Sequence, residues 1–451
     1  MSDFFSSGQP ILTARAPGRM DIMGGISDYS GSLLLQMPVK QTTIVQVQER
    51  TDSIIQLRSL IGKSKSQNFS IDSGLLVGKN YAEASAFIHS QPGGDWANYI
   101  LGCMMVLHIE KNLPFTGINV LIVSTVPMGK GVSSSASLEV ATMCALEKLY
   151  KIKLGDTELP LLAQKAENLM VGAPCGLMDQ LSSYLGHKSK LLPLICQPHK
   201  VFPPISIPSG VSFCGIDSGI RHAVSGASYS DVRTAAFMAY TIIAMQEGSS
   251  VHDLQQAKNS GHWESLPYKG FLANVPPSVF DTRFRDKLPE EISGKDFLEK
   301  YNISLDTVTQ INPDNIYKLR ACALHPVQEN YRIHLFNNLL KIFSAHKDKK
   351  ETMQLLGELM FQSHAGYTAV GLGNKNTDEI VERVLHAGPA KNVYGARVTG
   401  GGSGGTVAIL CYGKEGKQTA RKIFEEYREY HHIKSFFFAG SSNGAKMLNA
   451  E

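Results

Sequence analysis

A glycine- and serine-rich turn between a strand-like run and a helical run constrains this chain more than any other feature. Residues 118–126 read INVLIVSTV, which favours a buried strand, and residues 137–150 carry apolar side chains at helical spacing. The connecting sequence, Pro127–Leu138, reads PMGKGVSSSASL. A strand, a glycine turn and a helix amino terminus direct free backbone N–H groups and the positive end of the helix dipole to one place. The pattern therefore predicts an anion site, and an ordinary serine cap after a glycine turn is the alternative.

Glycine is concentrated in three places along the chain. The 41 glycines gather in Gly18–Gly31, in Gly129–Gly131 with Gly172 and Gly176 farther on, and in Gly400–Gly405. Glycine collects where the backbone turns sharply or approaches a ligand closely. One such cluster is common, but three in one chain require an explanation.

The expected elements mix isolated strands and helices. Strands are predicted at Leu33–Val39, Ile118–Val126 and Val407–Cys411, and helices at Ser137–Tyr150, Leu159–Val171, Ser230–Met245, Val327–Ser344 and Thr377–His386. This mixture favours an α+β fold over a regular βαβ series. The length of 451 residues suggests two or three domains, and the proline-rich stretch Gln197–Pro208 is the candidate join. We expect domains at 1–206 and 207–451, with an irregular insertion or cover at Asn259–Asn312.

Composition excludes several classes of protein. The net charge is only +4, from 44 basic and 40 acidic residues, which is too weak for an electrostatic nucleic-acid binder. The seven cysteines contain no CxxC pair, so neither structural zinc nor a disulfide framework is expected. The start, MSDFFSSGQP, is not a secretory signal, and no apolar run is long enough to span a membrane. We expect a cytoplasmic protein that is a monomer or a weak homodimer.

Three motifs occur in the order that is typical of one enzyme family. PMGKGVSSSASLEVA resembles the phosphate loop P-x-G-x-G-L-S-S-S-A of GHMP kinases. Ala16–Gly31, APGRMDIMGGISDYSG, is similar to the galactokinase signature APGRVNLIGEHTDYNGG, and Gly395–Val407, GARVTGGGSGGTV, is similar to the third family motif. The resemblance implies a two-lobed α+β GHMP kinase fold with mixed β-sheets and an active site in the cleft between the lobes. It also implies ATP contacts at Pro127, Gly129, Lys130, Gly131, Ser133, Ser134, Ser135 and Ala136.

The resemblance also assigns catalytic and metal-binding roles. Asp179 matches the aspartate of the family motif CGxMDQ, which takes the proton of the anomeric hydroxyl. Arg19 matches the arginine that lies beside this aspartate, where the alternative is a purely structural ion pair. Ser135 and Glu167 align with the two Mg²⁺ ligands, although Glu167 could also be a solvated helix residue. Two protein oxygens suffice for Mg²⁺ that also binds phosphate and water.

The sugar contacts match the family except at two positions. Asp28, Gly176, Asp179 and Tyr229 match residues that contact the sugar in galactokinases. Gly25 and Ile26 replace the family's Glu-His pair, whose glutamate lies near the sugar's 6-hydroxyl. Loss of a partner for a buried hydroxyl costs roughly 1–3 kcal/mol, so a sugar without that hydroxyl is favoured. L-Arabinopyranose is D-galactose without C6, and the variant MGGISDYSGS also resembles the kinase domain of plant-type L-arabinokinases.

The main hypothesis is therefore an ATP- and Mg²⁺-dependent kinase that forms L-arabinose 1-phosphate. A galactokinase with a rebuilt C6 pocket and a non-catalytic sugar-sensing paralogue are the alternatives. A sugar-acid kinase is less favoured, because Gly25 and Ile26 offer no cation for a carboxylate. His222, His325 and His364 are interpreted as structural histidines.

Overall fold

Two units make up the chain, and each contains segments that lie far apart in the sequence. The computed structural model describes residues 4–61, 65–173, 175–220 and 227–448. Unit 1 comprises Met1–Met20, Met37–Leu192 and Gly440–Glu451, and unit 2 comprises Asp21–Gln36 and Pro193–Ala439. This division differs from a single cut at 206/207 because strand pairing groups residues that the sequence separates.

A mixed sheet forms the base of unit 1. Its strands follow the order β15-β1-β2-β5-β3-β4. Their bounds are β1 Leu12–Met23, β2 Leu33–Glu49, β3 Ile54–Ile61, β4 Lys65–Asp72, β5 Ile118–Ser124 and β15 Lys446–Leu448. β3 runs parallel to β5, whereas β2 is antiparallel to β5, β4 to β3, and β15 to β1. The pairing Thr13↔Leu448 explains why the carboxyl-terminal segment belongs to this unit.

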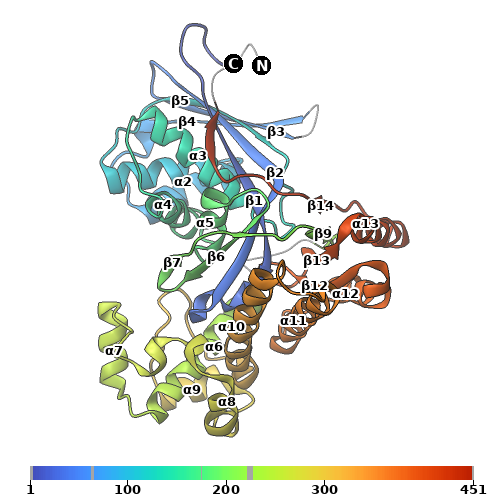
Figure 1. The fold of residues 1–451 in the computed structure, drawn as a ribbon. Helices are drawn as coiled ribbons and strands as arrows, with labels where there is room; N and C mark the ends of the chain where they lie inside the picture. Colours follow the sequence, from blue (N-terminus) through green and yellow to red (C-terminus); the bar gives the residue numbers. More distant parts are fainter. Residues whose placement is uncertain (1–3, 62–64, 174, 221–226, 449–451) are drawn as a thin grey trace. The chain divides into compact units, whose positions relative to one another are not determined.

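Helices cover the sheet of unit 1 and bury its apolar side chains. They are α1 Tyr81–His89, α2 Gly94–Lys111, α3 Ser134–Leu149, α4 Glu158–Ala166 and α5 Met178–Leu185. Figure 1 shows α2, α3, α4 and α5 packed together beside the strands. Their shared core includes Val45, Val120, Met104 and Val140, each at most 1% exposed. The core holds β5 and α3 in place on either side of the predicted phosphate loop.

The sheet of unit 2 is antiparallel throughout and has the order β12-β13-β9-β14. These strands are β9 Val211–Asp217, β12 Val393–Val398, β13 Thr406–Tyr412 and β14 Phe437–Ala439. Figure 1 shows α11 Lys349–Val370, α12 Lys375–Ala387 and α13 Gly413–Tyr430 beside them. Ile216, Ile380, Val407 and Ile423 share the core between these helices and strands.

A helical layer completes unit 2. It contains α6 Ala227–Gln246, α7 Val251–Ser260, α8 Pro277–Val279, α9 Gly294–Lys300 and α10 Leu319–Ile342, with the two-stranded sheet of β10 Ile292–Ser293 and β11 Ile316–Tyr317. The strands β6 Lys190–Cys196, β7 His199–Val201 and β8 Ile205–Ser206 belong instead to the mixed sheet, in which β6 pairs with β2, β7 and β8. The helix α10 starts eight residues before the predicted Val327 and contains Pro326. Buried Cys322, Ala323 and Val327 hold the helix across this proline. In the described part of the chain, no helix has both the length and the apolarity needed to cross a membrane.

Candidate active site

The predicted phosphate loop connects β5 to α3 in unit 1. Gly129, Gly131 and Ser133 all have positive φ angles, of 67°, 70° and 56°. These left-handed conformations reverse the chain sharply, and glycine adopts them without a steric penalty. The helix α3 then begins at Ser134, three residues earlier than expected. Ser134 and Ser135 therefore lie in the first turn of the helix, where unpaired N–H groups accumulate, and Ser133 directly precedes it.

Ser133 precedes α3 but does not cap it. No side-chain hydrogen bond caps the amino terminus of α3. The Ser133 hydroxyl instead donates to Oδ2 of Asp179, at 2.5 Å. The serine-cap alternative is therefore not what the structure contains. The first-turn N–H groups belong to Ser134, Ser135 and Ala136, which the sequence predicts as ATP contacts, and such groups at a helix start suit an anion.

Arg19 and Asp179 form an ion pair beside this loop. The Arg19 Nε and Nη2 atoms lie 2.8 and 2.7 Å from Asp179 Oδ1. The Nη1 atom donates to the Gly131 carbonyl at 2.7 Å, and the Arg19 backbone N–H donates to the Val132 carbonyl at 3.0 Å. The Arg19 side chain is 4% exposed, whereas that of Asp179 is 20% exposed. The structure therefore joins signature motif, phosphate loop and predicted base, and keeps the carboxylate accessible.

Glu167, one of the two predicted metal ligands, is a buried residue of unit 1. It begins a π-helical turn, Glu167–Val171, that follows α4. Its carboxylate accepts hydrogen bonds from Ser135, from Gln180 Nε2 at 2.7 Å and from the Cys175 thiol at 3.3 Å. The predicted metal-binding pair, Ser135 and Glu167, is therefore in direct contact. Gln180 and Cys175 were not predicted, although both lie in the motif around Asp179.

Glu139 is a further buried carboxyl group that the sequence reading missed. It is fully buried on α3, and Gln180 Nε2 also donates to its Oε2 at 3.1 Å. Burial, with the neighbouring Glu167, raises the pKa of Glu139 well above its usual range. Burial also raises the pKa of Glu167. Gln180 thus donates to both buried carboxyl groups, and burial disfavours the charged form of each. The i, i+4 spacing of Ser135 and Glu139 was the available signal.

The oxygen donors around Ser135 suit a hard divalent cation. The hydroxyl of Ser135 and the carboxylate of Glu167 supply two oxygens, which fits the preference of Mg²⁺ for few protein ligands with phosphate and water. Among the described residues, no group of three or more His, Cys, Asp or Glu side chains forms a metal cluster. The donor set therefore fits a cation carried by nucleotide phosphates better than a protein-only metal centre.

The signature turn of unit 2 contains the other predicted sugar contacts. Gly25, Ile26 and Asp28 are buried within a 3₁₀ turn, Gly25–Ser30, whose Asp28 Oδ1 accepts the Tyr29 N–H at 2.8 Å. The rings of Tyr29 and Tyr229 pack edge to face, 6.2 Å apart. The turn and α6 thus bring Gly25, Ile26, Asp28 and Tyr229 into one neighbourhood. Gly176 lies in unit 1, in the loop that leads to α5.

Arg233 supports this neighbourhood and was not predicted. It lies on α6, with its guanidinium carbon 5.6 Å from the centre of the Tyr29 ring. A two-point ion pair with Asp306, at 2.9 and 2.7 Å, holds the guanidinium in place. Burial opposes the charged form, but the hydrogen bonds and charge of Asp306 raise the pKa of Arg233, and the charge of Asp28 adds to this effect. The partner, Asp306, lies 73 residues away in the irregular segment, so no local sequence pattern reveals the pair.

Comparison with known proteins identifies the family. The family description "GHMP kinases N terminal domain" matches residues 98–187, "GHMP kinases C terminal" matches 343–432, and "Galactokinase galactose-binding signature" matches 2–49. A galactokinase of Chloroflexus aggregans is 30% identical over 404 residues, which cover 89% of this chain and 84% of that protein. The chain belongs to the galactokinase family of GHMP kinases. The predictions of an enzyme and of a sugar 1-kinase type are confirmed.

Other relatives of this GHMP kinase agree with the predicted resemblance and fold. An L-arabinokinase of Arabidopsis thaliana is 37% identical over 489 residues, which cover 98% of this chain and 46% of that protein. The chain thus spans about half the length of that relative. The crystal structure of Lactococcus lactis galactokinase complexed with galactose has a TM-score of 0.73 at 21% identity and covers 99% of this chain and 97% of that chain. A mevalonate kinase structure has a TM-score of 0.54 at 16% identity, with 97% and 100% covered. The α+β GHMP kinase fold is confirmed.

Two of the three histidines interpreted as structural are described in this kinase, and His222 lies outside the described residues. The ring of His364 makes two contacts: Nε2 lies 3.1 Å from Asp378 Oδ1, and Nδ1 accepts the Val398 N–H at 3.3 Å. His325 is buried, and within the described ranges neither of its ring nitrogens has a hydrogen-bond partner. Both side chains belong to the packing of unit 2.

Burial of His325 is expected to make folding sensitive to acid. Burial lowers the pKa of His325 to about 4. The His325 ring takes up a proton near pH 6.5 in the unfolded chain but only near pH 4 in the folded protein. Its contribution to the free energy of unfolding is therefore fully present above pH 6.5 and is lost as the pH falls from 6.5 to 4. We expect this residue to remove about 2 kcal/mol of unfolding free energy at pH 5 relative to pH 7. Urea unfolding at both pH values would show a smaller difference in His325→Leu, whereas the exposed-site control His432→Gln would keep the wild-type difference.

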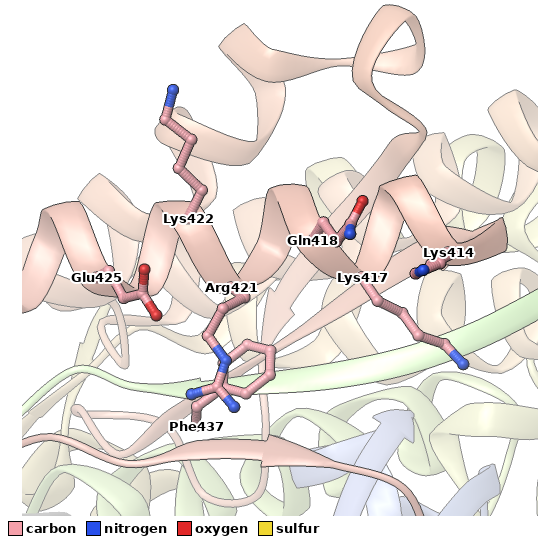
Figure 2. Close-up of a pocket in the computed structure, with 7 residues that line it drawn as sticks. All are labelled: Lys414, Lys417, Gln418, Arg421, Lys422, Glu425 and Phe437. Carbon is pink, nitrogen blue, oxygen red and sulfur yellow. The ribbon is translucent and has the colours of Figure 1, made fainter.

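A cationic hollow of about 370 Å³ lies along α13 in unit 2, apart from every predicted site residue. Figure 2 shows Lys414, Lys417, Gln418, Arg421, Lys422, Glu425 and Phe437 around it. The guanidinium carbon of Arg421 lies 4.3 Å from the centre of the Phe437 ring, so this arginine packs on the aromatic face. The opposite face of α13 buries Ala420, Ile423 and Phe424. The hollow is the solvent-facing side of an amphipathic helix.

Proposed function

We propose that this chain transfers the γ-phosphoryl group of ATP to the anomeric oxygen of L-arabinopyranose. The observation that carries the reaction type is the accessible Asp179 carboxylate, held by Arg19 and Ser133 beside the uncapped start of α3. The observation that favours the pentose is the apolar pair Gly25 and Ile26 in the signature turn. The likeness to an L-arabinokinase over 98% of this chain supports the same substrate.

In the proposed reaction Asp179 accepts the proton of the sugar's O1 hydroxyl. The O1–Pγ bond forms while the bond from Pγ to the bridging oxygen breaks, and ADP leaves with the bonding electron pair. Arg19 holds the Asp179 carboxylate in place and adds positive charge near the transferred group. The N–H groups of Ser134, Ser135 and Ala136, with Lys130, bind phosphate oxygens. Phosphoryl transfer depends mainly on such positioning and charge stabilisation.

The remaining predicted contacts fill the sugar and metal roles. Asp28 and Tyr229 would bind ring hydroxyls, and the backbone of Gly176 would approach the sugar closely. Ser135 and Glu167 would hold Mg²⁺, which supplies positive charge to the phosphate oxygens when it is bound. Burial and the neighbouring Glu167 raise the pKa of Glu139, which disfavours a second negative charge beside Glu167.

Metal dependence offers one test of these roles. We expect Ser135→Ala with Glu167→Gln to raise the Mg²⁺ concentration for half-maximal activity by about 10-fold or more, because both oxygen ligands are weakened. A magnesium titration at fixed ATP would measure this shift. Glu110→Gln, which removes an exposed carboxylate of the same unit, is the control. An unchanged titration curve in the double variant, or full activity in excess EDTA, would refute the metal assignment.

The proposed function is tested by ADP release with ATP and a panel of free sugars. L-Arabinose should give the highest kcat/KM, D-galactose a lower value and D-galacturonate the lowest. The product should lose its reducing end, because the phosphate is attached at C1. A higher value for D-galactose would replace the proposal by a galactokinase with an altered C6 pocket. No ADP release with any sugar would favour the non-catalytic sugar-sensing alternative.

A further inference from the structure

Gly25 lies against a tyrosine that leaves no room for a side chain. Its φ angle is +47°, a left-handed conformation. A Cβ atom at this position would lie 1.6 Å from the Tyr367 hydroxyl oxygen and 2.8 Å from Tyr367 Cζ. The first distance is about the length of a covalent bond, so any other residue at position 25 must displace the phenol. Glycine is therefore required here for as long as Tyr367 keeps its place.

Tyr367 is fixed in that place by two hydrogen bonds within unit 2. It lies on α11 and is 0% exposed. Its hydroxyl donates to the Gly400 carbonyl at 2.6 Å and accepts the Ile26 N–H at 2.9 Å. One phenol thereby ties the signature turn to the third glycine-rich motif. The position of Gly25 and Ile26 depends on this side chain, although Tyr367 is 341 residues distant from Ile26.

Arg397 completes the surroundings of position 25. Its Nη1 pairs with Asp21 Oδ2 at 2.6 Å, and its guanidinium carbon lies 5.3 Å from the centre of the Tyr367 ring. Among the described residues, its Nε and Nη2 atoms have no hydrogen-bond partner, although the side chain is fully buried. Nη2 would lie 3.0 Å from a Cβ at residue 25. Charge therefore favours a carboxylate on residue 25, whereas the phenol of Tyr367 and the left-handed backbone oppose one.

We propose that Tyr367 is the residue that sets sugar specificity, as the partner of Gly25. Its phenol occupies the volume where a side chain of residue 25 would begin. Residue 25 therefore cannot carry a polar side chain that would hydrogen-bond to the sugar at C6. It acts through Gly25 and Ile26 and is therefore a positioning residue. The inference rests on the proposed function, in which these two residues lie beside the sugar. It follows that the double change Gly25→Glu with Ile26→His does not restore galactose use unless Tyr367 is also shortened.

The first experiment compares Gly25→Glu, Tyr367→Leu and the double variant. We expect Gly25→Glu alone to lower the melting temperature and the activity on both sugars, because the glutamate collides with the phenol. The double variant should recover much of that melting temperature and raise the D-galactose to L-arabinose ratio of kcat/KM at least about 10-fold over wild type. The KM for ATP should stay unchanged. A folded, active double variant with the wild-type ratio would overturn the proposal.

The second experiment separates positioning from general stability. Tyr367→Phe removes a buried hydroxyl that donates to a carbonyl and accepts one N–H. Tyr427→Phe is the matched control, because the Tyr427 hydroxyl donates to the Ser218 carbonyl at 2.8 Å and accepts from Asn376 Nδ2 at 3.0 Å. Both variants should lose melting temperature, but only Tyr367→Phe should raise the sugar KM, by about 10-fold, at constant KM for ATP. Equal sugar KM values in the two variants would overturn the proposal, even if the double variant does not fold.

These experiments also distinguish a failure of the proposed function from a failure of the inference about Tyr367. If the sugar panel identifies a substrate other than L-arabinose, the proposed function fails. The comparison of Tyr367→Phe with Tyr427→Phe is then made with the identified sugar, and a selective rise in its KM still supports the role of Tyr367. If L-arabinose is the substrate and that rise is absent, only the inference about Tyr367 fails.

Discussion

Asp179→Asn is expected to lower kcat by at least about 100-fold, the lower end of the range for removal of a general base. The substitution keeps the size of the side chain. Asparagine Oδ1 can still accept from Arg19, and the Ser133 hydroxyl can turn to accept from the new amide. The charge and the proposed proton acceptor are lost, while the helix start that we propose for phosphate binding is unaltered. Nucleotide affinity, measured by calorimetry, should therefore stay close to that of wild type.

Asp52→Asn provides the matched control for that prediction. Asp52 also accepts a two-point contact from an arginine of unit 1, with Arg50 Nε and Nη2 at 2.7 and 2.6 Å. It lies on the exposed surface, and the Arg50 hydrogen bonds lower its pKa to about 2. Its amide variant should keep kcat within about twofold of wild type, because surface pairs of this kind contribute little. Turnover of Asp179→Asn at the level of this control would contradict the role of Asp179 as base.

Local patterns predicted the elements around the phosphate loop well, because their causes are local. Apolar runs and turn residues place β5 and α3 within a few residues of their predicted bounds. The observed bounds of the helices differ from the predicted bounds where packing overrides local sequence preference. The first serines of α3 join the helix although no side chain caps it, and α10 continues through Pro326. The division into units differs more from the predicted boundary at 206/207, because β15 pairs with β1 across more than 400 residues of sequence.

The candidate site was predictable where its chemistry lies inside motifs. Arg19, Ser133 and Asp179 come from three segments, and the structure brings their side chains together. The family resemblance supplied these positions, whereas spacing alone could not relate residues 160 positions apart. Gln180 and Cys175, which surround Glu167, lie inside a recognised motif but have no distinctive chemistry in sequence. Tyr367 gave no signal, because a buried tyrosine on a helix is ordinary until its hydroxyl is seen against Gly25.

At the position of the family's Glu-His pair, this chain has a different side chain in the same space and not an empty space. Sequence comparison shows only that Gly25 and Ile26 lack polar side chains. The structure adds that the space of the missing side chain is filled by the Tyr367 phenol, which also binds the backbone of Ile26. A vacant place would admit water, which could pair with a sugar hydroxyl. A space filled by the phenol admits no water, so a C6 hydroxyl there would have no hydrogen-bond partner. The free-energy penalty for a sugar with that hydroxyl is then larger.

The preference for L-arabinose over D-galactose is expected to be about 5- to 150-fold in kcat/KM, equivalent to roughly 1–3 kcal/mol for an unpaired hydroxyl. D-Fucose separates the two possible causes, because it carries a C6 methyl group without the hydroxyl. If the unpaired hydroxyl dominates, D-fucose should match L-arabinose, since a methyl group against Ile26 costs no hydrogen bond. If the volume of Ile26 dominates, D-fucose should be as poor as D-galactose, and Ile26→Ala should improve both hexoses together. A wild-type enzyme that turns over D-galactose faster than both other sugars would show that neither effect operates and that the pentose assignment is wrong.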